Sequence, residues 1–73
     1  MKGLTERQKE TLLWIKNFIR KNQMPPTVRE IGRAFDIQSS TAFHILKALQ
    51  GKGYVQRGNL GARSLKLLKK KLS

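Results

Sequence analysis

Residues 25–49 read PPTVREIGRAFDIQSSTAFHILKAL, and the fold class can be inferred from this segment. Its two leading prolines cannot continue a helix that precedes them, so a new element begins here. Thr27 and Glu30 then form a capping box, in which two side chains bond the free backbone N–H groups at the start of a helix. Apolar residues follow at helical spacing, which predicts a short helix over residues 28–35.

The same stretch continues, after a short turn at residues 36–38, into another helix. Ser39 is the expected N-cap, because a serine hydroxyl accepts a hydrogen bond from the first turn. We predict this helix over residues 40–50 and expect Gly51 and Gly53 to end it. Its inward face carries Ala42, Ile45, Leu46 and Leu49.

Upstream of the prolines, Thr5 and Gln8 form another capping box and predict a helix over residues 6–22. Leu13 falls on the polar side of this helix, and Trp14 borders the apolar stripe as an expected edge of the core. The inward stripe consists of Thr11, Leu12, Ile15, Phe18 and Ile19.

Downstream of Gly53 the pattern changes from a helical to a strand period. Residues 54–57 and 64–67 alternate apolar and polar side chains, and a glycine-containing turn lies between them. This pattern predicts a β-hairpin over residues 54–67. Val55, Leu65 and Leu67 are expected to face the helices, and residues 69–73 form a basic tail.

The predicted fold is therefore mainly α with a small β-hairpin. Two helices joined by so short a turn have the spacing of a helix-turn-helix, whose second helix enters the DNA major groove N-terminus first. The hairpin supplies a wing. We expect one domain, a three-helix winged helix-turn-helix over residues 1–68.

The charge of the chain indicates a polyanionic partner. Its 73 residues include 16 Lys and Arg against 4 Asp and Glu, a formal net charge of +12. Residues 37–73 contain eight of the basic residues and no acid. Such a basic half repels itself unless a partner neutralises it.

Catalysis, metal binding and membrane insertion are not expected. The chain has no cysteine, one histidine, and no apolar run near the ~20 residues that span a bilayer. No arrangement of nucleophile and base is visible, so we predict a protein that is not an enzyme and needs no cofactor. We expect a cytoplasmic, nucleoid-associated location.

The candidate DNA-binding residues form two groups. The outward face of the helix over residues 40–50 carries side chains that can contact base edges, and none is an acid that would repel phosphate. This recognition group is Ser39, Ser40, Thr41, Phe43, His44 and Lys47. Side chains expected on the phosphate backbone, from helix starts, wing and tail, are Thr27, Arg29, Lys52, Arg57, Arg63, Lys66, Lys69, Lys70 and Lys71.

Several motifs resemble the N-terminal DNA-binding domain of the LexA repressors. They are LTERQ (4–8), PPTVREIG (25–32), SST (39–41), LKAL (46–49), KGY (52–54) and ARSL (62–65). The resemblance covers about residues 1–68 and implies a winged helix-turn-helix repressor that binds operator half-sites. Phe43 and His44 depart from the family's reading residues, so the operator sequence does not transfer.

The LexA family also has a second domain, which dimerises the protein and cleaves the chain at an Ala-Gly bond with a serine and a lysine. This chain contains no Ala-Gly dipeptide, so self-cleavage is not expected of it. We expect either an excised domain or a short natural relative, and the net charge of +12 favours the hypothesis of a relative.

The leading hypothesis is a transcriptional regulator that binds duplex DNA, a LexA-like repressor. Its useful specificity would need a weak homodimer on an inverted repeat or the help of a partner. Two alternatives stay open. One is an architectural protein that binds DNA with little sequence preference, and the other is a module that binds polymerase, another transcription protein or another repressor.

Overall fold

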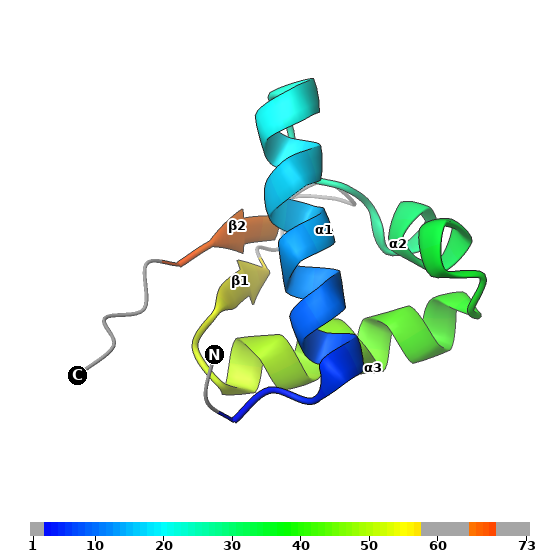
Figure 1. Cartoon of the computed structure of the whole chain (residues 1–73), viewed down its shortest axis with the longest axis vertical. Helices are drawn as coiled ribbons and strands as arrows, with labels where there is room; N and C mark the ends of the chain where they lie inside the picture. The colour runs from blue at the N-terminus through cyan, green and yellow to red at the C-terminus, as the bar shows by residue number, and fades with distance from the viewer. Residues whose placement is uncertain (1–2, 58–64, 69–73) are drawn as a thin grey trace.

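Three helices and a hairpin make up the fold. The computed structural model describes residues 3–57 and 65–68. Along the chain these residues form α1 (Glu6–Asn22), α2 (Val28–Phe35), α3 (Ser39–Gly51), β1 (Val55–Arg57) and β2 (Leu65–Leu67) (Figure 1). The predicted class, mainly α with a helix-turn-helix and a small β-hairpin, is confirmed.

Both predicted capping boxes are present. At α1 the Gln8 N–H donates to Thr5 Oγ1 and the Thr5 N–H donates to Gln8 Oε1, each at 3.2 Å. At α2 the Glu30 N–H donates to Thr27 Oγ1 at 3.1 Å, and the Thr27 N–H donates to Glu30 Oε1 at 2.8 Å. Each box satisfies backbone donors that the helix itself leaves free, so the boxes fix where α1 and α2 begin.

The start of α3 differs from the prediction. Gln38, not Ser39, is the N-cap, with extended backbone and no side-chain cap bond, and its carbonyl accepts the Ala42 N–H at 3.0 Å. Ser39 is therefore the first helical residue. The tight turn out of α2 already sets Gln38 in the cap conformation, so the hydroxyl of Ser39 is not needed there.

The end of α3 separates the roles of the two glycines. Gly51 is the last helical residue, and Lys52 is the C-cap with right-handed backbone. Gly53 has a φ of 84°, a conformation that favours glycine, and so makes the reversal into β1. The prediction is confirmed for Gly53, while Gly51 has an ordinary helical backbone.

The turn between α2 and α3 depends on a close backbone approach at Gly32. The Ile37 N–H donates to the Gly32 carbonyl at 2.8 Å. Gly32 is buried, and a Cβ atom there would lie 2.8 Å from the Ile37 carbonyl oxygen. This approach holds the chain leaving α2 against α2 itself, and it sets the position from which α3 begins.

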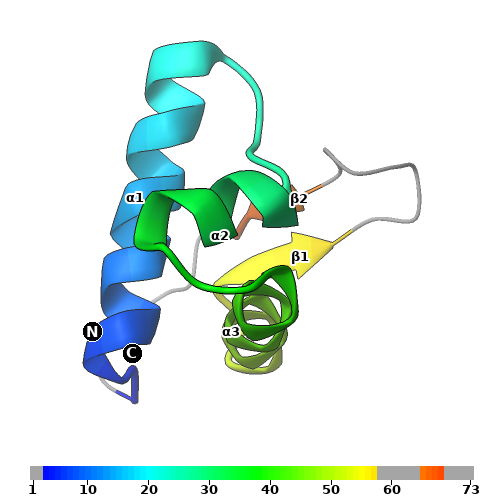
Figure 2. The ribbon, with the colours of Figure 1, turned by 90° about the vertical axis from the view of Figure 1, so that its right-hand side faces the viewer.

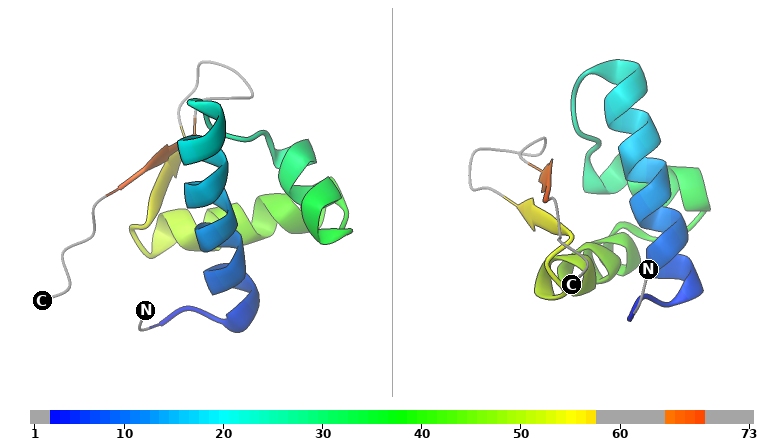
Figure 3. Two further views of the ribbon diagram at one scale, coloured as in Figure 1. Left: turned by 45° about the horizontal axis from the view of Figure 1, so that its top comes forward. Right: turned by 60° about the vertical axis from the view of Figure 1, so that its left-hand side comes forward.

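The core lies between the helices and the hairpin. α1 lies across α3 (Figure 3), and the two helices pack with α2 and the hairpin around one cluster of buried side chains. Leu13 is 44% exposed, as its place outside the stripe predicts, and the Trp14 ring packs edge-on against Phe35 at 6.0 Å between centroids. The buried apolar residues are Leu12, Ile15, Ile31, Ala42, Leu46, Leu49, Tyr54, Val55 and Leu65.

The two strands pair antiparallel, with Val55 opposite Leu67 and Arg57 opposite Leu65. Val55 and Leu65 are buried and Leu67 packs against the core, as predicted. The Tyr54 N–H donates to the Leu49 carbonyl at 2.9 Å and ties the hairpin to the end of α3. Figure 2, which looks nearly along α3, shows α1 on one side of that helix and the hairpin turned toward the other. The predicted turn at residues 58–61 lies outside the described residues.

Candidate nucleic-acid interface

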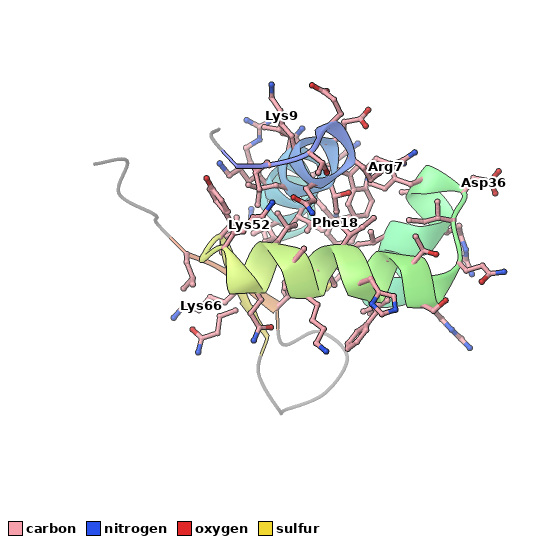
Figure 4. All side chains as sticks on the ribbon, turned by 90° about the horizontal axis from the view of Figure 1, so that it is seen from below. Arg7, Lys9, Phe18, Asp36, Lys52 and Lys66 are labelled. Carbon is pink, nitrogen blue, oxygen red and sulfur yellow. The ribbon has the colours of Figure 1, made fainter. Side chains whose placement is uncertain are left out.

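The outward face of α3 is polar and open to solvent. Ser39, Ser40, Thr41, His44 and Lys47 are exposed, and Phe43 is half-buried. Ser40, His44 and Lys47 follow one another at the spacing of a single helix face, opposite the buried Ala42, Leu46 and Leu49. The structure thus brings the whole predicted recognition group onto the outward side of α3, the helix that lies in front in Figure 4.

The acids of the chain lie elsewhere. Glu6 and Glu10 are on α1, and the Glu30 carboxylate accepts the Thr27 N–H at the start of α2. Asp36 caps the end of α2, and Figure 4 shows it beside α2 rather than on the face of α3. The outward face of α3 therefore carries hydroxyls, an imidazole and an ammonium without an opposing carboxylate, a composition suited to an anionic surface.

The starts of α2 and α3 also offer backbone donors. Arg29 is exposed in the first turn of α2. The Thr27 hydroxyl is half-buried and already accepts the Glu30 N–H, so its position is fixed by the capping box. Free N–H groups at helix N-termini are a common place for phosphate oxygens.

Lys52, which was predicted on the phosphate backbone, bonds to the N-terminal segment of the chain. Its Nζ donates to the Gly3 carbonyl and, at 2.7 Å, to Gln8 Oε1, so its ammonium lies at the N-terminus of α1. The contact joins residues 44 apart in sequence, and no local pattern announces it. Lys52 thus supports the packing of α1 against the end of α3, a role that the sequence analysis missed.

The hairpin that was predicted to form the wing is described in part. Lys66 is exposed on β2, and Figure 4 shows it on the side of the molecule opposite Lys9 of α1. Arg57 ends β1. Arg63, Lys69, Lys70 and Lys71 lie outside the described residues.

A hollow beside the second half of α1 is lined by Trp14, Asn17, Phe18, Lys21 and Asn22, and none of these is a nucleophile or a general base with a partner. Within residues 3–57 and 65–68, no three His, Cys, Asp or Glu side chains gather as a metal site would need. Nor is any helix in that part of the chain long and apolar enough to cross a membrane.

Comparison with known proteins identifies the family. The family described as LexA DNA binding domain matches residues 1–64. The LexA repressor of Thermotoga maritima is 51% identical over 69 residues, an alignment that covers 94% of this chain and 35% of that protein. The LexA repressor of Leptospira biflexa is 42% identical over 69 residues, covering 94% and 34%. That of Anaeromyxobacter dehalogenans is 47% identical over 66 residues, covering 89% and 29%.

The chain thus spans about a third of the length of the curated relatives that it matches. The match extends over all three helices and into the hairpin, the elements that position the outward face of α3. On these grounds the chain belongs to the LexA DNA binding domain family.

Proposed function

We propose that this protein binds duplex DNA and represses transcription, with α3 inserted in the major groove. The observation that carries the proposal is the acid-free outward face of α3, the second helix of the helix-turn-helix. The relatives that match nearly all of this chain are named repressors, which supports the regulatory role.

The dimensions of α3 suit this role. The major groove of B-DNA is about 12 Å wide and admits one helix, and there each base pair presents a distinct pattern of donors and acceptors. From Ser40 to Lys47 the helix rises about 10 Å, or roughly three base-pair steps. A single domain therefore reads a short half-site, and useful specificity requires a second copy on an inverted repeat.

The basic residues outside α3 are proposed to hold the phosphate backbone. Arg29 at the start of α2 and Arg57 and Lys66 on the wing strands belong to this group, as do Arg63 and residues 69–71 from the sequence. Such contacts position the protein without reading sequence. Each phosphate contact adds about 0.9 to the slope of log affinity against log salt, so removing the three tail lysines should flatten that slope by up to ~2.7.

Selection from a randomised duplex library at ~0.15 M salt, followed by sequencing of the retained DNA, tests the proposal. We expect an enriched motif, with an inverted repeat if two copies bind together. If DNA were retained but no motif were enriched, the protein would bind DNA without reading its sequence, as an architectural protein does. If no duplex were retained, the proposal would be wrong, and the outward face of α3 would then have to meet a protein.

A further inference from the structure

The side chains at the centre of the outward face of α3 determine which base edges it can read. Lys47 has three donors and no acceptor, so it fits base edges that present only acceptors. In the major groove guanine offers two such acceptors side by side, N7 and O6, whereas thymine offers only O4. Cytosine instead presents a donor, which a carboxylate would accept, and the acids of this chain are Glu6, Glu10, Glu30 and Asp36, none of them on α3.

Phe43 is an apolar side chain on the edge of the same face. Its side chain is half-buried on that face. Its ring lies edge-on beside the His44 imidazole, at 6.1 Å between centroids and 66° between planes. A half-exposed aromatic ring in the major groove has one apolar feature to cover, the C5-methyl group of thymine.

We propose that α3 reads a thymine and a guanine within about two base pairs of each other, with Phe43 on the thymine methyl and Lys47 on guanine N7 and O6. The spacing follows from the rise of about 6 Å between the two residues along the helix, against 3.4 Å per base pair. This inference rests on the proposed function, since it specifies what the same face recognises.

Single-atom changes in the DNA test each contact without altering the protein. In the duplex recovered by selection, thymine is replaced by uracil, and this change removes only the methyl group. Guanine is replaced by 7-deazaguanine, which removes only the N7 acceptor. With the wild-type protein, affinity measured by fluorescence anisotropy should fall about fourfold for the first change and roughly tenfold for the second.

Variants then assign each loss to a side chain. Phe43→Ala should bind the thymine and uracil duplexes with equal affinity. Lys47→Met should bind the guanine and 7-deazaguanine duplexes with equal affinity. Lys47→Arg, whose guanidinium also fits guanine, should again bind the 7-deazaguanine duplex more weakly. Lys16→Met, which removes an exposed charge from α1, is the matched control and should keep both sensitivities.

The outcomes separate this inference from the proposed function. An enriched motif without a thymine and a guanine at this spacing would overturn the inference and leave the proposed function intact. If the affinity of the wild-type protein were unchanged by both base changes, the inference would likewise be overturned. This result does not depend on whether any variant folds. If no duplex bound at all, the proposed function itself would be overturned.

Discussion

Gly32 and Gly51 provide a matched test of how the helix-turn-helix is held together. Both lie in helices, so alanine gains helix propensity at either position. A Cβ at Gly51 meets nothing within 4 Å, whereas a Cβ at Gly32 lies 2.8 Å from the Ile37 carbonyl oxygen. The same substitution should therefore stabilise the protein at one site and destabilise it at the other.

The magnitudes follow from these contacts. Ordinary van der Waals contact begins at 3.4 Å, so the turn at Ile37 must move by about 0.6 Å to admit the new methyl group. Overpacking of this kind costs about 1–3 kcal/mol, offset by a gain in propensity of about 1 kcal/mol. We expect Gly32→Ala to lower the free energy of unfolding by about 1 kcal/mol net. Gly51→Ala, at the helix end, should raise it by about 0.5 kcal/mol.

Thermal unfolding followed by circular dichroism measures both effects. For a domain of this size 1 kcal/mol corresponds to about 4–8 °C, so Tm should fall by that amount for Gly32→Ala and rise by about 2–4 °C for Gly51→Ala. Gly32→Ala should also weaken DNA binding below its Tm, because the displaced turn carries the start of α3. If Gly32→Ala melted at or above the wild-type Tm, the close approach at Gly32 would not be what holds the turn.

Three further substitutions test base reading by α3, the cap of α2 and the role of Lys52. Lys47→Ala should lose roughly 1–3 kcal/mol of binding free energy on the preferred DNA site and relax specificity there. Competition with random duplex measures this loss. The control Lys16→Ala should weaken binding to both duplexes alike or not at all. Thr27→Ala should lower the free energy of unfolding in urea by about 1 kcal/mol, since it removes the cap of α2, and Thr27→Ser should recover most of that loss. Lys52→Met should lower the free energy of unfolding by about 1 kcal/mol, because its hydrogen bonds are lost. It should leave the salt dependence of DNA binding unchanged. A flatter salt slope would show that Lys52 contacts phosphate.

The elements that the sequence predicted best are those governed by local chemistry. Thr5 with Gln8 and Thr27 with Glu30 place both ends of a hydrogen-bonded cap within four residues, so the starts of α1 and α2 could be read directly. The period of apolar residues likewise predicted the buried face of α3, which leaves Ser40, His44 and Lys47 outward.

Features that depend on how one element is placed against another could not be read in this way. Ser39 is a good cap by residue type, but the turn out of α2 places Gln38 in that position. Lys52 looked like one more surface cation, and only the packing of α1 across the end of α3 brings its ammonium to Gln8. Gly32 gave no local signal either, because its close neighbour is the carbonyl of a residue in the following turn.

Mapping backbone amide shifts in the ¹⁵N-labelled protein, as the selected duplex is added, shows which face of the protein docks on DNA. Docking through α3 predicts that the largest changes fall on residues 39–47, while the exposed side of α1 around Lys9, Leu13 and Lys16 changes little. Changes centred on that side of α1, with α3 undisturbed, would contradict it.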